Sequence, residues 1–522
     1  MARQCPTQPF SVRGEPTLRV AHSSQAPTQT RPALQSTEPT RRNSSSQLPG
    51  PRLSPMLGWW PNVLPMLRDP AISMLHLWYR YGDAVSLGNY RDAPILIVFS
   101  PEYNRYVLTN NDIFYSLDVN SGDALFKVPP DTSAARLLSG IASMNGEEHT
   151  AHRRLLMPSF HKKRVDALRD SMVECVENHI AGWRDGDPRI LVNEMLDLTL
   201  AVAIVGLIGL NPAEEGKRVR NLIEQWSQRG LTPQVALLPY DLPGTPYRRF
   251  RVLSEQVEAE LIEVIKRKRT RVGSADDGNE GDALALLIHA QDEDGTLLSD
   301  SDLIGHLSTL FTAGHETTAS ALTWTLFLLT QHPHILADLV DELDGVLHGD
   351  APSLEQLHNL PLLDNIVNEG LRMFPPGMWI FRTAVKPFEL GPYSQPAFSQ
   401  LIFSPTVTHY RPDLYPNPHT FDPHRWETIN PTPYEYLPFG GGPRRCLGAT
   451  FALLEIKLAL SIILQRWRIE VPHRHRVDRS GTILSRPKDG PPITIHKQDR
   501  HFVHSAVRGN IHDLVDFGPT YK

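Results

Sequence analysis

Cys446 lies in the segment whose residue types point most clearly to chemistry. Residues 439–448 read F-G-G-G-P-R-R-C-L-G, so three glycines and a proline make a tight turn just before the cysteine. We expect a helix from Ala449, and the helix dipole and unpaired backbone N–H groups favour a thiolate at a helix N-terminus. Arg444 and Arg445 add positive charge beside it. The loop therefore predicts a stable thiolate that acts as a metal ligand or as a nucleophile.

Three other interpretations of this loop stand beside the thiolate. A single free cysteine is usually a small buried hydrophobic residue. The glycines would also suit a phosphate loop, but the G-x-x-x-x-G-K-[ST] pattern does not occur in the sequence. A nucleophile would need a histidine partner, which the local sequence does not identify. On the loop alone, a functional thiolate and a structural cysteine remain equally open.

The spacing F-x-x-G-x-R-x-C-x-G resembles the haem-binding loop of the cytochrome P450 family, at Phe439, Gly442, Arg444, Cys446 and Gly448. The resemblance implies that Cys446 is the proximal thiolate ligand to haem iron, a ligand that favours O–O cleavage. Phe439 would pack beside this thiolate, and Arg444 would pair with a haem propionate. Gly442 and Gly448 would let the backbone approach the porphyrin closely.

A second motif, A-G-H-E-T-T at residues 313–318, falls in the middle of a long expected helix. In an ordinary helix its threonine hydroxyls would bond to backbone carbonyls and Glu316 would be solvated. A glycine inside a helix costs ~1 kcal/mol relative to alanine, so Gly314 needs a reason. The motif resembles the oxygen-activation motif of the same family, which implies that Ala313 and Gly314 lie beside the haem and that the helix opens locally. Thr317 would hold dioxygen and relay protons, with Glu316 assisting proton delivery.

Glu369 and Arg372 are three residues apart on one face of an expected helix. Such pairs are common and worth only ~0.2–0.5 kcal/mol when exposed, so the pair alone is a weak signal. Its position before the cysteine loop resembles the E-x-x-R pair of the family. Arg425, in F-D-P-H-R-W, resembles the third member of that triad. The resemblance gives Glu369, Arg372 and Arg425 a structural role in the core beside the haem.

Further basic residues match positions that bind the haem propionates in the family. His149 and Arg153 are four residues apart and share a helical face. The family often has W-x-x-x-R here, so the role of His149, which replaces the Trp, is less secure than that of Arg153. Arg382, in W-I-F-R-T-A, and His409 are the other expected contributors. Without the resemblance, His149 and Arg153 would read as a solvated basic face.

The elements that must position these motifs are mainly helical. Between about residues 146 and 343 the pattern is helical, and Ser299–Asp302 offers N-caps for a helix that can continue to His332 before Pro333. Such a helix approaches ~50 Å and would cross the molecule. Short β-like runs occur at 84–87 and 94–99, and residues 118–145 are expected to form a long loop. We predict a mainly α (α+β) cytochrome P450 fold with small β-sheets and a long central helix.

Composition sets the outer limits. Three cysteines cannot staple 522 residues, which excludes a disulfide scaffold, and a net charge of −6 argues against nucleic-acid binding. Residues 1–54 hold seven Arg and two Glu, a net charge of +5, and are rich in Pro, Ser and Gln. The predicted organisation is a disordered extension at 1–48, a haem domain at 49–497 and a tail at 498–522. No membrane span is expected, since the apolar run 199–210 is too short and reads as a core helix. We expect a soluble cytoplasmic protein, with organelle targeting by the extension as a minor alternative.

The predicted function is that of a haem-thiolate monooxygenase that carries heme b and inserts one oxygen atom from O2 into an apolar organic substrate. Electrons would come from a separate ferredoxin or flavodoxin, because no flavin or iron–sulfur motif is present. Arg444, Arg445 and Lys457 would attract such an acidic partner. The expected substrate pocket involves 118–145, 231–246, Ala313 and 378–381.

Two alternatives remain at this point. One is a haem-thiolate enzyme that uses peroxide or rearranges hydroperoxides and needs no electron donor. The other is a haem-binding sensor or carrier without catalytic activity. The pair Glu316 and Thr317 argues against the first alternative, because that chemistry needs no proton delivery to dioxygen.

Overall fold

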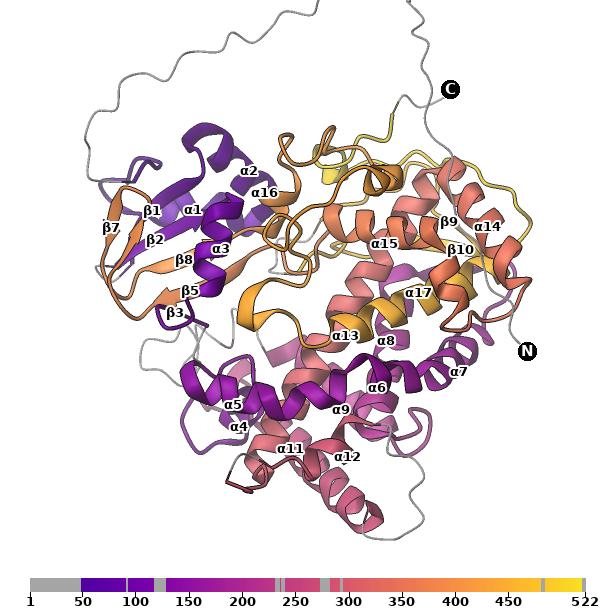
Figure 1. Ribbon diagram of the computed structural model, residues 1–522, viewed down its shortest axis with the longest axis horizontal. Helices are drawn as coiled ribbons and strands as arrows, with labels where there is room; N and C mark the ends of the chain where they lie inside the picture. Colours follow the sequence, from indigo (N-terminus) through magenta and orange to yellow (C-terminus); the bar gives the residue numbers. More distant parts are fainter. Residues whose placement is uncertain are drawn as a thin grey trace, which may run out of the picture. The chain divides into compact units, whose positions relative to one another are not determined.

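One long helix runs through the centre of the computed structural model and carries the A-G-H-E-T-T motif (Figure 1). This helix, α13 (Asp300–Gln331), has 32 residues and is therefore about 48 Å long. It begins with a capping box: the Ser299 hydroxyl accepts from the backbone N–H of Asp302, and the Asp302 carboxylate accepts from the backbone N–H of Ser299. It ends at Gln331 with His332 as its C-cap, directly before Pro333, in agreement with the predicted end near His332.

The structure describes residues 48–90, 93–116, 128–230, 235, 240–272, 282–291, 294–479 and 484–518. Within these ranges, α13 packs against helices from distant parts of the chain, because its surface is apolar along most of its length. Its most extensive helix contacts are with α4 (Ser133–Leu138), α8 (Leu191–Ile208), α11 (Pro246–Val272), α14 (Pro333–Leu347), α15 (Pro361–Met373) and α17 (Ala449–Arg466).

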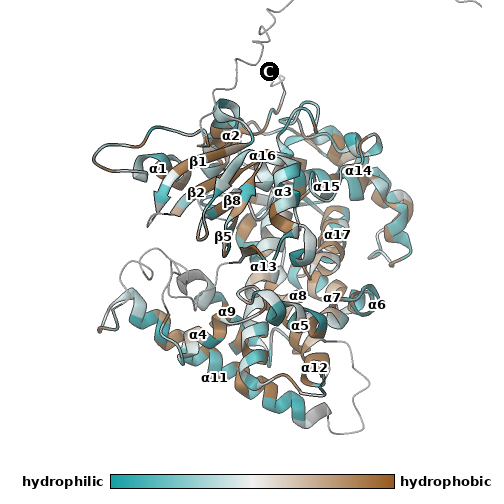
Figure 2. Ribbon diagram, turned by 60° about the vertical axis from the view of Figure 1, so that its left-hand side comes forward, coloured by the Kyte–Doolittle hydropathy of each residue, from teal (hydrophilic) through white to brown (hydrophobic). Residues whose placement is uncertain are grey.

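The remaining helices lie around these. They are α1 (Trp60–Arg68), α2 (Pro70–Tyr81), α3 (Pro101–Thr109), α5 (Gly146–Leu156), α6 (Lys162–Ala167), α7 (Arg169–Ile180), α9 (Lys217–Gly230), α12 (Ala283–Ile288) and α16 (Pro405–His409). Most have one apolar face directed at the core, which is visible in Figure 2 as brown inner and teal outer surfaces.

Helix α8 is the one described helix that is long and apolar enough to cross a membrane. Most of its side chains are buried, and it packs tightly against α13. The Thr199 hydroxyl donates to the backbone carbonyl of His315 at 2.9 Å, which joins the two helices beside the motif. This helix is therefore the buried core helix that the sequence predicted for this apolar run.

The strands are short and lie mostly on one side of the helices (Figure 1). A five-stranded sheet has the order β1 (Ala84–Tyr90), β2 (Ala93–Val98), β8 (Gln400–Phe403), β5 (Ile380–Ala384), β3 (Phe114–Tyr115). Only β2 and β8 are parallel in it. A three-stranded sheet has the order β4 (Asp187–Ile190), β10 (Pro492–Lys497), β9 (Trp467–Glu470), and a hairpin pairs β6 (Phe388–Leu390) with β7 (Tyr393–Gln395).

The segment expected to be a long loop, residues 118–145, is not structureless where it is described. It contains α4, whose N-cap Thr132 accepts a hydrogen bond from the Ala135 N–H. The pattern of small residues there had hidden a short helix, because a six-residue helix gives little periodicity. Residues 118–127, most of 231–239 and the acidic loop at 273–281 lie outside the described residues.

Residues 498–518, expected to be a tail, pack on the domain. Val507, Ile511, Leu514 and Val515 are buried against the main hydrophobic core. The backbone N–H of Asp516 donates to the His419 carbonyl at 2.8 Å, and the His419 ring donates to the Leu514 carbonyl at 3.0 Å. We call residues 498–518 the C-terminal strap.

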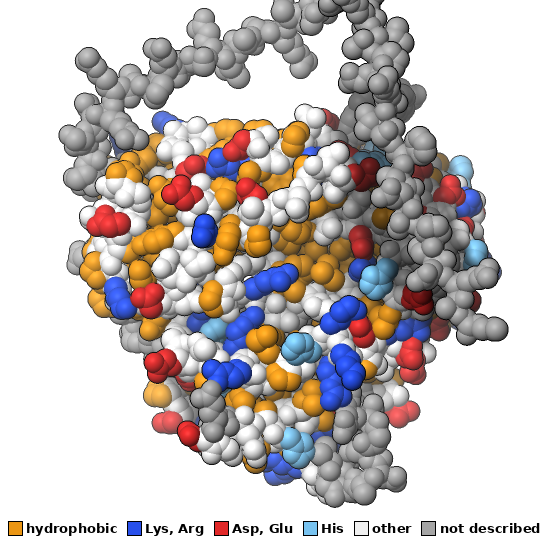
Figure 3. Space-filling model, in the orientation of Figure 1, with side chains coloured by type: hydrophobic (Ala, Val, Ile, Leu, Met, Phe, Trp, Pro, Cys, Tyr) orange, Lys and Arg blue, Asp and Glu red, His pale blue; other side chains and the backbone are white. Residues whose placement is uncertain are grey.

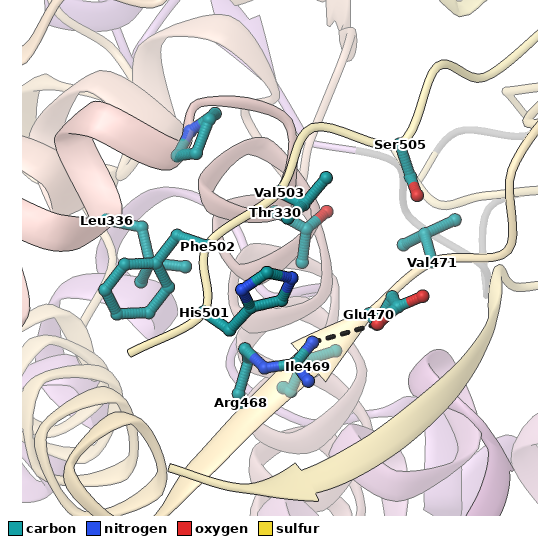
Figure 4. Close-up of a pocket in the computed structure, with 11 residues that line it drawn as sticks. Thr330, Leu336, Arg468, Ile469, Glu470, Val471, His501, Phe502, Val503 and Ser505 are labelled. Atoms are coloured by element: carbon teal, nitrogen blue, oxygen red, sulfur yellow. Dashed lines mark hydrogen bonds and ion pairs between the residues drawn. The ribbon is translucent and has the colours of Figure 1, made fainter. Parts of the chain in front are cut away.

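A shallow pocket lies where the strap crosses the end of α13 (Figure 4). Thr330, Leu336, Ile469 and Phe502 line it. Thr330 is 13 residues beyond Thr317 on the same helix, a distance of about 20 Å. This pocket is therefore not part of the predicted active site.

Candidate active site

The cysteine loop is a closed turn held by its own backbone. The Cys446 N–H donates to the Phe439 carbonyl at 2.8 Å, and the Arg445 N–H donates to the Gly442 carbonyl at 3.0 Å. Gly440 and Gly442 have φ of 63° and 65°, a region that glycine adopts without strain. Helix α17 begins at Ala449, as predicted, so the cysteine sits just before a helix N-terminus.

Gly442 and Gly448 of this loop differ in whether the structure has room for a side chain. A Cβ added to Gly442 would lie 2.2 Å from the carbonyl oxygen of Leu108, so Gly442 is required by the close approach of α3 as well as by its φ. A Cβ added to Gly448 would meet no atom within 4 Å. Of the two, the backbone at Gly448 is the one open to a flat ligand.

The environment of Cys446 can support a thiolate only in part. Burial raises the pKa of the thiol, while the Gly448 N–H and the charges of Arg153 and Arg445 lower it. The residue is nevertheless exposed to solvent in the structure, so its sulfur is not packed into the hydrophobic core. A metal ion at this position would complete the deprotonation. By contrast, burial raises the pKa of Cys175 to about 12, so that thiol is chemically inert.

The hydrophobic core is interrupted where the A-G-H-E-T-T motif lies. Residues up to Phe311 on α13 belong to one hydrophobic cluster, and residues from Ala319 belong to another. Ala313 and Gly314, between these clusters, are exposed although they are in the middle of a mostly buried helix. A Cβ at Gly314 would meet no atom within 4 Å. Leu447, next to Cys446, packs against the cluster of Phe311, so the loop and the motif border the same interruption.

Helix α13 is a continuous helix through the motif. The Thr317 hydroxyl donates to the Ala313 carbonyl at 2.6 Å, and the Thr318 hydroxyl donates to the Gly314 carbonyl at 2.8 Å. Bonds of this kind compete with the helix for the same carbonyls and weaken it locally. The helix was expected to open locally at Gly314 and Thr317, but the structure shows no break there. Instead, the two threonine hydroxyls bond to carbonyls of their own helix.

Glu316 points to a neighbouring helix. Its Oε1 accepts a hydrogen bond from the hydroxyl of Ser227 on α9. Trp226, the adjacent residue, donates from Nε1 to the Ser254 hydroxyl of α11 at 2.9 Å, which fixes this end of α9. Sequence reasoning missed Ser227, because nothing in the local sequence marks a serine that meets a residue 89 positions away.

Four basic residues expected to contact propionates come together. His149 is buried, and burial together with the charges of Arg444, Arg153 and Arg382 lowers its pKa to about 4. Burial and the neighbouring Arg444 lower the pKa of Arg382 to about 10, and burial and Arg153 lower that of Arg444 to about 10. Each shift reports like charges crowded into a low-dielectric region.

This arginine cluster has no anionic partner in the part of the chain that the structure describes. Arg153, Arg382 and Arg444 donate only to neutral oxygens: the Arg445, Phe381 and Met144 carbonyls and the Asn145 amide. The Nε atoms of Arg382 and Arg444 are buried without a hydrogen-bond partner. Unpaired buried cations are costly, so the cluster is complete only with an anionic ligand. A group with two carboxylates and a metal for Cys446, as in haem, fits these residues.

The structural triad is a finished network. Both Glu369 carboxylate oxygens accept from Arg372, at 2.8 and 2.9 Å, and Arg425 Nε donates to Oε1 at 3.0 Å. Trp426 Nε1 and the Asp422 N–H also donate to this carboxylate. Glu369 and Arg372 are fully buried. Burial would raise the pKa of Glu369, but the two arginines outweigh it and the net shift is downward.

His409 does not join the arginine cluster, contrary to expectation. Its Nδ1 donates to the Arg372 carbonyl at 3.0 Å, and its Nε2 accepts from the Leu437 N–H at 2.8 Å. Burial and the charge of Arg372 lower its pKa to about 3, so the ring is neutral. Both ring nitrogens are thus engaged by backbone, and His409 connects the triad to the segment that leads into the cysteine loop.

Of the three cations expected to attract a redox partner, only Arg445 is placed to do so. Arg444 points inward to the arginine cluster, and Lys457 forms an ion pair with Asp364 at 2.7 Å. Arg445 is exposed, and so is Lys163 on α6, which packs against α17. Neither forms an ion pair within the described ranges. Figure 3 shows several Lys and Arg side chains on this face of the molecule.

The segments expected to line the substrate pocket are described only in part. At 378–381, Met378 is buried, and the rings of Trp379 and Phe381 are 4.8 Å apart. Trp379 Nε1 is buried without a hydrogen-bond partner in the described residues. A buried Trp N–H usually has a hydrogen-bond partner, so this donor is available to a ligand.

Comparison with known proteins agrees with this site. The model of the cytochrome P450 family matches residues 49–491. Cyclooctatin synthase from Streptomyces melanosporofaciens is 34% identical over 78% of this chain and 87% of its own. Cyclooctat-9-en-7-ol 5-monooxygenase from the same organism is 30% identical over 84% of this chain and 92% of its own.

Solved structures show the same fold. A cyanobacterial protein with retinoic acid bound, CYP120A1, superimposes with a TM-score of 0.73 at 27% identity, covering 87% of this chain and 100% of the other. The haem domain of cytochrome P450DA has a TM-score of 0.72 at 24% identity, covering 87% of this chain and 98% of the other, and this likeness concerns the fold alone.

The cysteine loop, the arginine cluster and the long central helix thus define a haem-thiolate protein. The chain belongs to the cytochrome P450 family, and it is a monooxygenase that carries a haem-iron cofactor, acts on an organic substrate with O2 and depends on a redox partner.

Proposed function

We propose that this chain binds heme b and inserts one oxygen atom from O2 into an apolar substrate, by hydroxylation or epoxidation. The observation that supports the proposal is the partly buried arginine cluster near Cys446, which lacks an anion in the described residues. The names of two relatives, for cyclooctatin and cyclooctat-9-en-7-ol, support a largely hydrocarbon substrate. We also propose a cytoplasmic location for the protein.

The metal ligand can be tested by spectroscopy. Reduced protein with CO is expected to show the strongly red-shifted Soret band of a thiolate ligand, and Cys446→Ala should abolish it. Cys175→Ala is the matched control and should leave the band unchanged, because Cys175 is buried on α7. A band typical of an imidazole ligand in the unmodified protein would contradict the assignment.

Each site residue has a defined task in this function. The Cys446 sulfur holds the metal, while Arg153, Arg382 and Arg444 supply charge-assisted hydrogen bonds to propionates. A bound haem supplies the redox chemistry that activates O2. The Thr317 hydroxyl holds a proton at Oγ1, which it now donates to the Ala313 carbonyl and can turn toward a ligand at Gly314. Glu316 supplies the carboxylate through which protons enter.

Ser227 acts as a positioning residue for this carboxylate. Its hydroxyl donates to Glu316 Oε1 and so holds this carboxylate against α9. Proton delivery then requires this hydrogen bond to break, so Ser227→Ala should raise the rate of proton delivery and shift the pH profile of coupling between O2 use and product. Ser227→Thr keeps the hydroxyl and is the control. A profile that is the same in all three proteins would remove this role.

Thr317→Ala distinguishes monooxygenase activity from the two alternatives. Loss of the hydroxyl should uncouple O2 consumption from product formation while substrate binding remains. Unchanged coupling would favour the enzyme that uses peroxide or rearranges hydroperoxides. A protein that binds haem but yields no product with any surrogate redox partner would favour the sensor.

The electron donor is proposed to be an acidic ferredoxin or flavodoxin that docks near Arg445 and Lys163. Arg445→Glu with Lys163→Glu should slow reduction at low salt by about tenfold, and high salt should remove the difference. Arg474→Glu, an exposed cation beside the C-terminal strap, is the control. Equal reduction rates for all three proteins at low salt would refute the docking site.

A further inference from the structure

Large apolar side chains are exposed together near the start of the described chain. Met56 is 93% exposed, and five others between residues 53 and 67 are more than half exposed. We call this set the N-terminal apolar face; its members are Leu53, Met56, Leu57, Trp60, Leu64 and Leu67. Isolated exposed apolar residues are ordinary, but six within 15 residues form a patch that marks an interaction surface.

The face is built on a fixed backbone. Ser54 and Gly58 exchange two backbone hydrogen bonds of 2.9 Å, which close a tight turn with Met56 and Leu57 at its tip. The Asn62 amide donates to the Leu87 carbonyl of β1 at 3.2 Å. Gly88, at φ 117°, lets Leu53 approach so closely that a Cβ there would lie 2.5 Å from its side chain. The apolar residues are therefore displayed by a docked segment.

Helix α1 directs its apolar side outward. Trp60, Leu64 and Leu67 have i, i+4, i+7 spacing and share one face. Met66, on another face, is 1% exposed and belongs to the core. Helix α1 packs mainly against α2, at the edge of the molecule near β1 and β2 (Figure 2), which leaves the outer face uncovered in the described residues.

The charged residues around the N-terminal apolar face indicate what kind of partner it binds. Residues 53–67 contain no charged side chain, and Arg52 and Arg68 flank them. The chain before them is also basic, with six Arg and two Glu in residues 1–47, a net charge of +4. Two adjacent tryptophans, stacked at 4.6 Å, are typical of segments at a membrane–water boundary. An apolar face with flanking arginines is complementary to an anionic lipid surface.

We propose that the N-terminal apolar face inserts into the surface of a membrane that contains anionic lipids, so that this domain lies on the bilayer without spanning it. A second copy of the chain is a poorer partner, because a symmetric contact would bring two arginine-rich segments together. The proposal is independent of the substrate and of the reaction proposed above.

Sedimentation of the full haem-loaded chain with vesicles tests this proposal. Vesicles of equal parts phosphatidylcholine and phosphatidylglycerol should bind the protein, and pure phosphatidylcholine or high salt should weaken binding. Leu64→Gln with Leu67→Gln should lower the partition coefficient by about tenfold or more. Both positions are exposed, so the CO spectrum should remain that of the unmodified protein.

The matched control is Leu297→Gln with Val503→Gln, at 51% and 58% exposure against 53% and 54% for the test pair. This control should bind vesicles as the unmodified protein does. The proposal is overturned if the unmodified chain does not bind anionic vesicles, or if the test pair binds as well as the control. It is also overturned if the protein is a dimer without lipid and the test pair makes it monomeric, since the face would then serve self-association.

Discussion

Two groups of arginines lie in this molecule with opposite consequences, one buried in the triad and one partly buried in the arginine cluster. In the triad, Arg372 and Arg425 surround Glu369, and every oxygen of that carboxylate is engaged. In the arginine cluster, Arg153, Arg382 and Arg444 crowd around a neutral His149 without a carboxylate among the described residues. The same side chain thus has a raised pKa at Arg372 and a lowered one at Arg382.

The presence or absence of a counter-ion separates arginines that stabilise the fold from arginines that are available to bind a ligand. Buried ions need a partner, since desolvation costs several kcal/mol for each of them. The triad finds its partner within the chain, so it contributes to folding. The positive charge of the cluster is not balanced within the described residues. This lowers the stability of the protein without haem and increases its affinity for an anionic ligand. Changes to single residues in the two regions should therefore have different signatures.

The largest effect is expected from Glu369→Gln. An uncharged amide would leave two arginines buried without a counter-ion, and breaking such a network costs roughly 3–5 kcal/mol. Urea denaturation of the protein without haem measures this loss. Glu369→Asp, which keeps the charge, should lose less. If the amide variant is as stable as the parent protein, the triad is not the complete network described above.

The contribution of His149 can be measured from the pH dependence of the free energy of unfolding. Its pKa is about 4 when folded and 6.5 when unfolded, so the unfolded state binds more protons between these values. Stability is fully present above pH 6.5 and is lost as the pH falls toward 4, by up to about 3 kcal/mol for this group. His306, His332 and His409 have lowered pKa values as well, so the difference between the parent and His149→Gln is the relevant quantity. Denaturation at several pH values should show a shallower slope for His149→Gln.

Arg382→Gln should weaken haem binding without lowering the stability of the protein that lacks haem. Without haem, the variant is expected to be as stable as the parent or more stable, because an unpaired buried cation is gone. Its affinity for haem should fall about tenfold or more, since a hydrogen bond to a charged group is worth about 1.5–3 kcal/mol. Arg425→Gln should instead destabilise the protein without haem. Titration with haem and urea denaturation together measure both effects; equal losses of stability in the two variants would erase the distinction.

The smallest effect is expected at an exposed pair. Arg500 bonds to Asp341 and to Asp344 on α14, and all three side chains are about half exposed or more. Solvent screens such pairs, so Arg500→Ala should change the free energy of unfolding by less than ~1 kcal/mol. A loss as large as that of Glu369→Gln would show that burial is not what separates the two regions.

Much of the frame could be predicted because its signals are local. The capping residue Ser299 and the terminator Pro333 lie within a few residues of the ends they define, and both ends of α13 agree with the prediction. The start of α17 at Ala449 follows from the glycine-rich turn before it. Roles that depend on a partner far away in the sequence were harder to predict. Ser227 and Asn145 gain their roles only where the fold brings them to Glu316 and Arg444.

His409 shows why a residue type does not define a role. A histidine near the haem side of the chain suggested a ligand donor, but both of its nitrogens meet backbone groups 28 and 37 positions away. Hydrogen bonds to backbone carry no sequence signal at the partner, since every residue has the same groups. The C-terminal strap was missed for a related reason: its four buried apolar residues are too few and too irregular to form a periodic pattern.

The strap also bears on how the protein is made. The Thr420 carbonyl accepts from Arg372 and Arg425 of the triad, and the neighbouring His419 is tied to Leu514 and Asp516. These two residues are synthesised almost a hundred positions after Thr420. Asn510 likewise reaches back to Asp69, near the beginning of the domain. A growing chain on the ribosome therefore cannot complete these hydrogen bonds around the triad before residue 516 has emerged.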